Sequence, residues 1–296
     1  MKTFVIFPLL LLLFVPAGLR ADTGASGQLW SDYQAAKANQ HNTITNPLVL
    51  QSSSQGARLR ADVYSEIGHD FNKLATALGA MENWCDFMPL NLNIKACVYQ
   101  RQGQQQYITF YAGRKFYQTP DETEPLRYEF SLVQSSADYL KVVLSAERGP
   151  YGTRDYNIMV QAMPLGEGSS LIHVHTAYTT SLWSRVGTSV YLATLGRDKE
   201  GFTIEGYDED RQPLYVKGVR GIIERNTVRY YFALLALLEA QGLPQGQQFE
   251  QRLNTWFDLT QAYPRQLYEL DKDEYLAAKR RERQNQILLQ EKIATP

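Results

Sequence analysis

The chain of 296 residues lacks the features that identify many enzymes and nucleic-acid-binding proteins directly. We find no nucleophile elbow, phosphate-binding loop, dinucleotide fingerprint or helical zinc motif. Basic residues do not outnumber acidic ones, with 30 Lys and Arg against 31 Asp and Glu, so nucleic-acid binding is not expected. Beyond its N-terminal region, the sequence has no run long and apolar enough to predict a transmembrane helix. These absences weaken an enzymatic interpretation without excluding one.

The first 21 residues have the order of a secretory signal. Lys2 precedes an almost unbroken apolar run from Phe4 to Val15, Pro16 ends the run, and small residues follow up to Ala21. The apolar run is shorter than the roughly 20 residues that span a bilayer. We therefore expect cleavage after Ala21 rather than an uncleaved anchor, and a mature protein that is periplasmic or secreted.

Cysteine is scarce, with only Cys85 and Cys97 in the chain. In an oxidising compartment, two cysteines close in sequence predict one disulfide. A loop this short should contribute about 3 kcal/mol by restricting the unfolded chain. Two separate buried thiols are the alternative. A catalytic thiol is disfavoured because neither cysteine has a histidine beside it in the sequence.

Alternating apolar and polar residues predict an antiparallel meander through the centre of the chain. One strand is expected over 58–64 and a helix over 70–81, and six further strands follow with short breakers such as Gly149-Pro150 between them. Connections this short imply antiparallel pairing, because parallel pairing needs a long crossover. The six strands are expected over 94–101, 106–113, 126–133, 139–146, 154–163 and 170–180.

After the meander the sequence becomes helical. The longest helix is expected over 218–241, and it is apolar on nearly all sides from Tyr230 to Leu238, so it must be covered on more than one face. Gly242-Leu243-Pro244 ends it. The other expected elements are a helix over 182–195, a hairpin over 202–216, and helices over 247–262 and 272–292.

This order of elements resembles the helix-grip fold of START-like proteins, a superfamily that includes lipid-transfer domains, polyketide cyclases and plant allergens. Trp84 followed by Pro89 is similar to a tryptophan-to-proline stretch often found after the first helix of that group. A closer resemblance, over about 46–285, is to exported bacterial proteins of unknown function in the same superfamily. The segments that carry it are Trp84–Asp86 with Cys97, Gly149–Tyr156, Tyr191–Lys199, Val219–Asn226 and Tyr263–Leu267.

The resemblance implies an α+β fold in which a curved antiparallel sheet of about seven strands wraps around a long C-proximal helix. Residues 181–217 form an insertion before that helix, and helices are added after it. Both additions depart from a minimal domain and are placed to cap or fill a cavity between sheet and helix. The expected division is a signal peptide over 1–21, a flexible leader over 22–45 with one short helix near 30–38, a helix-grip domain over 46–242 and a C-terminal helical extension over 243–296.

His173 and His175 are the most distinctive candidate site residues. They lie two apart on a predicted strand and so point to the same face, a geometry that metal sites use. A metal site needs at least one more ligand, and the sequence shows no partner near them. We therefore interpret both as half-buried polar residues on the cavity side or the solvent side, and we assign no metal or cofactor.

Charged residues at the ends of predicted elements are candidates for holding an anionic group. Arg154 begins a strand, although local pairing with Asp155 is the simpler interpretation. Arg197 and Lys199 close a helix, where they complement the helix dipole. These positions therefore predict an anion site only weakly.

The long helix carries two charged pairs spaced by four residues. Arg220 and Glu224 are expected to pair on the surface, which contributes only about 0.3–0.5 kcal/mol. Arg225 and Arg229 repel each other unless an acidic group faces them. A protein carboxylate is favoured over an anionic ligand as that group, because structural ion pairs are commoner.

Tyrosine is abundant, with 19 residues, many of them on predicted strands. Aromatic rings with polar tips suit the lining of a cavity that holds an amphipathic molecule. They are equally ordinary strand residues. The candidate ligand-binding residues are Tyr128, Arg154, His173, His175, Tyr178, Arg225 and Tyr230.

The resemblance leads to three hypotheses about function, each resting on fold analogy. The first is an exported soluble protein that holds a hydrophobic small molecule or lipid between the sheet and the long helix. The second is a structural protein of the cell envelope with a filled core, which contacts a partner protein through its C-terminal helices. The third is an enzyme of the cyclase or hydrolase type that uses a cavity His or Tyr as acid or base. A non-enzymatic role is favoured.

Overall fold

The computed structural model describes residues 24–41, 44, 48–181 and 200–294. The expected signal peptide, the helix expected over 182–195 and the segment Tyr191–Lys199, with Arg197, lie outside the described residues. None of the described helices combines the length and the apolarity needed to cross a bilayer.

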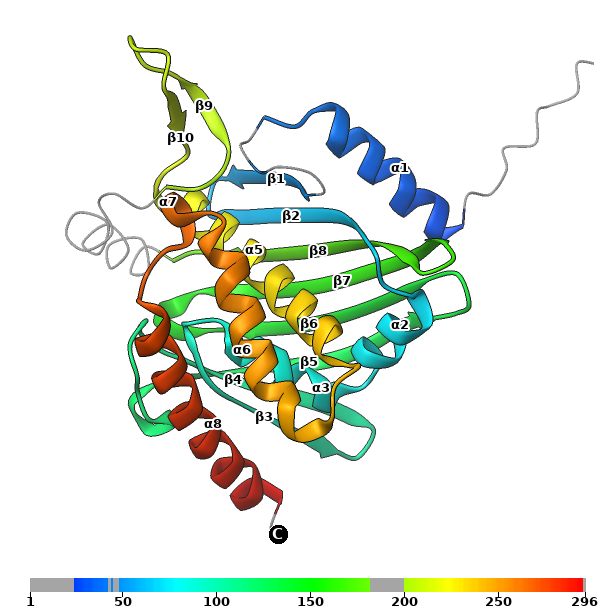
Figure 1. The fold of residues 1–296 in the computed structure, drawn as a ribbon, viewed down its shortest axis with the longest axis vertical. Helices are drawn as coiled ribbons and strands as arrows, with labels where there is room; N and C mark the ends of the chain where they lie inside the picture. The colour runs from blue at the N-terminus through cyan, green and yellow to red at the C-terminus, as the bar shows by residue number, and fades with distance from the viewer. Residues whose placement is uncertain (1–23, 42–43, 45–47, 182–199, 295–296) are drawn as a thin grey trace, which may run out of the picture.

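Eight strands form one antiparallel sheet in the order β1-β2-β8-β7-β6-β5-β4-β3 (Figure 1). The α+β helix-grip expectation is confirmed, with one strand more than expected. The additional strand is β1, whose Ser- and Gln-rich second half gives no alternating pattern. The strands are β1 (Leu48–Gln55), β2 (Arg58–Ile67), β3 (Ile94–Gln102), β4 (Gln105–Ala112), β5 (Glu124–Ser135), β6 (Leu140–Arg148), β7 (Arg154–Gly166) and β8 (Ser169–Thr179).

The long helix α5 (Gly218–Ala240) lies against the sheet, where it contacts β2 and β8 (Figure 1). Helix α6 (Gln245–Gln261) packs on its outer side, and the indole N–H of Trp256 donates to the carbonyl of Arg229 at 3.1 Å. This double cover explains why nearly every residue from Tyr231 to Leu238 is buried. This agrees with the sequence, in which the stretch from Tyr230 to Leu238 is apolar on nearly all sides.

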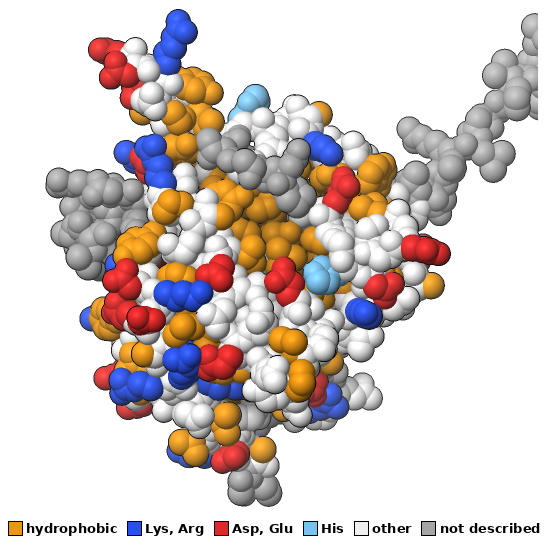
Figure 2. Space-filling view, in the orientation of Figure 1, with side chains coloured by type: hydrophobic (Ala, Val, Ile, Leu, Met, Phe, Trp, Pro, Cys, Tyr) orange, Lys and Arg blue, Asp and Glu red, His pale blue; other side chains and the backbone are white. Residues whose placement is uncertain are grey.

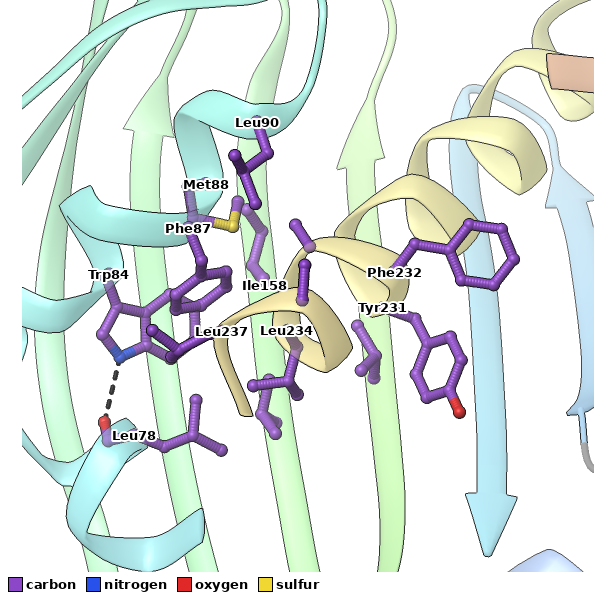
Figure 3. Packing of buried hydrophobic residues seen from close by; sticks show 14 of the residues in the cluster. Leu78, Trp84, Phe87, Met88, Leu90, Ile158, Tyr231, Phe232, Leu234 and Leu237 are labelled. Atoms are coloured by element: carbon purple, nitrogen blue, oxygen red, sulfur yellow. Dashed lines mark hydrogen bonds between the residues drawn. The ribbon is translucent and has the colours of Figure 1, made fainter. Parts of the chain in front are cut away.

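Two short helices, α2 (Phe71–Gly79) and α3 (Met81–Phe87), follow β2, where the sequence predicts a helix over 70–81 and a short turn of helix within 83–93. The chain breaks between them because Ala80 is extended, at φ −97° and ψ 119°. Trp84 is 1% exposed, and its indole N–H donates to the carbonyl of Leu78 at 2.9 Å (Figure 3). The predicted disulfide is also present, since Cys85 of α3 is bonded to Cys97 of β3.

The C-terminal helix α8 (Lys272–Ala294) lies along the edge strand β3 (Figure 1). Gln286 accepts a hydrogen bond from the N–H of Cys97 at 2.9 Å and donates one to the carbonyl of Cys85 at 3.0 Å. Gln290 bonds the N–H and the carbonyl of Tyr99 at 2.9 and 3.1 Å. The two glutamines therefore take the place of a neighbouring strand and protect an edge that is otherwise open to pairing.

The N-terminal helix α1 (Ala25–Ala38) begins earlier than the helix expected near 30–38. Its buried residues Leu29 and Tyr33 join a small cluster with Tyr64 and Leu171 of the sheet. Alternation along β2 and β8 places this cluster on the face opposite α5. This part of the predicted leader is thus packed on the sheet.

A small hairpin precedes α5 and is fastened to it by Glu224, which is fully buried. Its carboxylate accepts hydrogen bonds from the N–H groups of Phe202 and Thr203 at 2.6 and 3.1 Å. Arg220 instead pairs with Glu205 at 3.1 Å, so the expected surface pair of Arg220 with Glu224 is wrong. The remaining elements are β9 (Ile204–Tyr207), β10 (Pro213–Tyr215), α7 (Pro264–Leu267) and three single 3₁₀ turns over Met88–Leu90, Pro120–Glu122 and Pro150–Gly152.

Candidate functional site

A cavity of about 690 Å³ lies between the sheet and the first half of α5. Strands β4, β5, β7 and β8 supply one wall. Helix α5 supplies the other through Val219, Ile222, Asn226 and Tyr230, which recur every three or four residues and so share one stripe of the helix. The cavity therefore exists because this stripe is not pressed against the sheet, whereas the second half of α5 is tightly packed.

Four tyrosines gather around the cavity from different elements: Tyr128 of β5, Tyr156 of β7, Tyr178 of β8 and Tyr230 of α5. The rings of Tyr156 and Tyr178 stack with centroids 5.2 Å apart, and Tyr128 meets Tyr156 edge-on at 6.2 Å. Burial raises the pKa of Tyr230 to about 12 and also raises the pKa values of Tyr128 and Tyr178. Their hydroxyls therefore remain protonated near neutral pH and can donate hydrogen bonds.

Besides the tyrosines, the lining includes the polar residues Asn93, Arg114, Thr153, Thr176, Thr180 and Asn226. The hydroxyl of Tyr156 donates to Thr153 at 2.8 Å. Thr176 is 6% exposed, and its hydroxyl has no hydrogen-bond partner among the described residues. Within the described lining, Arg114 is the only charged residue, and its side chain is exposed. The interior of the cavity is consequently uncharged, with hydrogen-bonding groups on an aromatic wall.

The structure gives a reason for glycine at position 149, the first residue of the Gly149–Tyr156 segment singled out in the sequence. A Cβ atom at Gly149 would lie 2.4 Å from a ring carbon of Tyr156, closer than any real contact allows. Glycine is therefore needed for the ring of Tyr156 to reach its position in the cavity wall.

The seven candidate ligand-binding residues do not come together in the structure. Tyr128, Tyr178 and Tyr230 line the cavity. His173 and His175 lie on the opposite face of the sheet, because they alternate along β8 with Val174, Thr176 and Tyr178, which face inward. The two histidines therefore cannot touch a molecule held in the cavity.

The two candidate arginines are also outside the lining. Arg154 is exposed and lies 3.6 Å from Asp155, the local pairing that the sequence favoured. Arg225 is buried at 4% exposure away from the cavity lining. Its helical neighbour Arg229 pairs with Glu269 at 3.2 Å, so a protein carboxylate faces the arginine stripe, as expected.

The histidines meet a residue that the sequence did not single out, Asp62 of the neighbouring strand β2. Although burial opposes its ionisation, hydrogen bonds from His173, His175 and Arg60 hold the pKa of Asp62 well below its ordinary value. Burial lowers the pKa of His173. The pairing of β2 with β8 joins residues more than a hundred positions apart, so no local pattern could reveal this cluster.

No family profile and no curated protein sequence matches the chain. Solved structures with similar folds include the aromatase/cyclase Zhui from a Streptomyces species, at 12% identity and a TM-score of 0.41, covering 64% of this chain and 98% of that one. Truncated norcoclaurine synthase from Thalictrum flavum is 14% identical, with a TM-score of 0.32 and coverage of 49% and 91%. A conserved protein of unknown function from Enterococcus faecalis is 8% identical, with a TM-score of 0.36 and coverage of 80% and 98%. The helix-grip arrangement itself rests on the strand order and the position of α5.

Proposed function

We propose that this protein binds a hydrophobic small molecule with a polar end, held between the sheet and α5. The cavity of about 690 Å³ is the observation that carries the proposal. Ligand pockets range over about 300–1,000 Å³, whereas a core filled by side chains would leave nothing of that size. A filled core, and a purely structural role with it, is therefore the weaker alternative.

The lining indicates the chemistry of the ligand. Aromatic and aliphatic side chains favour an apolar body, and the tyrosine hydroxyls with Thr176 favour a hydrogen-bonding group at one end. Among the described lining residues, no charged side chain lies inside to neutralise an ionised group, since the one charged residue, Arg114, is exposed. If the ligand is an acid, its carboxylate should therefore lie near Arg114 rather than among the tyrosines.

We further propose that binding takes place outside the cytoplasm. The signal-like order of the first 21 residues supports export. The disulfide between Cys85 and Cys97 supports it independently, because disulfides persist mainly in oxidising compartments.

An envelope partner at the C-terminal helices stays a prediction. Acidic and basic side chains mix on the face formed by α6 and α8 (Figure 2). Some of them pair with each other, as Arg280 does with Glu250 at 2.8 Å. Leu288 and Ile287 of α8 are 64% and 38% exposed and offer apolar side chains for contact with such a partner.

Filling the cavity tests the proposal. Asn226 faces the cavity from α5 and its side chain makes no hydrogen bond or ion pair among the described residues, so Asn226→Trp should narrow the cavity without removing a contact of the fold. The probe is N-phenyl-1-naphthylamine, whose fluorescence rises in an apolar site. We expect the unmodified protein to bind about one probe per chain and Asn226→Trp to bind it about tenfold more weakly or worse.

The matched control is Leu288→Trp, which adds the same side chain to an exposed position. It should bind the probe as the unmodified protein does. Equal probe binding by Asn226→Trp, with circular dichroism showing a folded protein, would overturn the proposal.

A further inference from the structure

Three side chains that commonly bind metals converge beneath α1, on the face of the sheet opposite the cavity. The Nε2 atom of His173 lies 2.9 Å and the Nδ1 atom of His175 lies 2.8 Å from the same oxygen of Asp62. The three atoms all lie within 4.8 Å of one another. The strand pairing fixes this arrangement, because Asp62 of β2 is directly opposite His175 of β8.

The spacing suits a small divalent ion. Zinc binds histidine nitrogen and carboxylate oxygen at about 2.0–2.2 Å, so tetrahedral ligand atoms are about 3.3 Å apart. Each histidine nitrogen would need to move only a few tenths of an ångström away from the Asp62 oxygen to reach this spacing, and the two nitrogens lie within 4.8 Å of each other. Two histidines and one carboxylate are also the set that catalytic zinc sites and non-haem iron sites use, with remaining positions left to water or substrate.

Neighbouring groups hold His173 and Asp62 in the orientation that a metal requires. The Nδ1 atom of His173 lies 2.8 Å from the amide oxygen of Gln161, so a hydrogen on Nδ1 would be held there while Nε2 gives up its hydrogen to bind a metal. The ring of His173 stacks on the ring of Tyr64, with the ring centroids 4.1 Å apart and an angle of 6° between the ring planes. The second oxygen of Asp62 accepts from Arg60 at 2.6 Å, which leaves the first oxygen for an ion.

Space for further metal ligands, such as water, lies on one side of Asp62. Asp62 and Arg60 line a polar hollow of about 360 Å³, which also includes Gln51 and Ser52 of β1. The side chains of His173, His175 and Asp62 are only 6%, 14% and 3% exposed. An ion there would be shielded by protein on most sides and reached by water through the hollow.

We infer that Asp62, His173 and His175 form a binding site for one divalent transition-metal ion, with zinc as the probe that tests it. The site lies on the other face of the sheet from the cavity, and so it does not depend on the proposed ligand. It joins β2 to β8 through side chains, and its open position makes it suited to bind a further small group.

The test uses tag-free protein stripped with a chelator and titrated with Zn²⁺ against a chromophoric chelator. We expect one high-affinity zinc per chain. Gln161→Leu should weaken zinc binding about 10- to 100-fold, the usual effect of losing a group that orients a histidine ligand. His175→Ala removes a ligand and should weaken it more than Gln161→Leu does.

The matched control is His69→Ala, which removes a half-buried histidine outside the cluster. It should leave zinc affinity unchanged. If His175→Ala does not fold, Co²⁺ added to the unmodified protein provides a second readout, because four-coordinate cobalt gives intense visible absorption. The inference would be overturned if the unmodified protein neither bound zinc nor gave that absorption with Co²⁺. It would also be overturned if His69→Ala and His175→Ala lost equal zinc affinity.

Discussion

Gln286 gives the sharpest prediction for the role of the C-terminal helix. Its side chain bonds the N–H of Cys97 and the carbonyl of Cys85, and both bonds are buried. Gln286→Ala leaves two buried backbone groups without partners, at about 1–3 kcal/mol each. Release of the glutamine's rotamer entropy, up to about 2 kcal/mol, offsets part of this. We expect the free energy of unfolding to fall by about 2–4 kcal/mol.

Gln290→Ala is the matched control, because the same side chain makes the same pair of bonds to Tyr99 at a half-buried position. Water can replace that side chain, so we expect a loss of only about 1 kcal/mol. Urea unfolding followed by circular dichroism measures both, provided the slope with urea is unchanged. Equal losses in the two variants would refute the reasoning that α8 protects a buried sheet edge.

Three further predictions concern the disulfide, a buried lysine and the cavity wall. Cys97→Ser should lower the unfolding free energy by about 3 kcal/mol in urea, and no loss would show that the disulfide does not constrain the unfolded chain. Burial and then the charge of Lys279 lower the pKa of Lys95 to about 8, below its value in the unfolded chain. Above pH 8 the unfolded state therefore binds more protons than the folded state, and the free energy of unfolding should rise by about 2 kcal/mol from pH 8 to 10. Lys95→Met should reduce that rise without removing it, because burial also lowers the pKa of Lys279, and an unchanged rise would assign it elsewhere. Gly149→Ala should displace Tyr156 and weaken naphthylamine binding about tenfold with little loss of stability, whereas unchanged binding would exclude Tyr156 from the site.

Local periodicity predicted most elements of the sheet and helices, because each strand alternates on its own. The expected strand over 126–133 lies within β5, and the expected helix over 218–241 matches α5 closely. β1 was missed because serine and glutamine on a strand give no apolar alternation. The expected helix over 70–81 runs past the break at Ala80, because Met81 continues the apolar spacing of α2.

The candidate site was predictable only in part. Tyrosines on strands pointed to Tyr128 and Tyr178, because their polar tips suit a cavity lining. The side of the sheet on which His173 and His175 lie could not be read from the sequence, since alternation fixes which residues share a face but not which face is covered by α5. Asp62 is a third case, because its contact with the histidines depends on the long-range pairing of β2 with β8.

Native mass spectrometry of detergent-free protein tests the central claim most directly. The account predicts that the protein, expressed with its N-terminal segment in bacteria, carries one non-covalently bound apolar molecule that organic solvent extracts. Asn226→Trp should carry less of that molecule, because the added ring takes up part of the cavity of about 690 Å³. A bare mass for the unmodified protein, together with no binding of naphthylamine, would contradict the account.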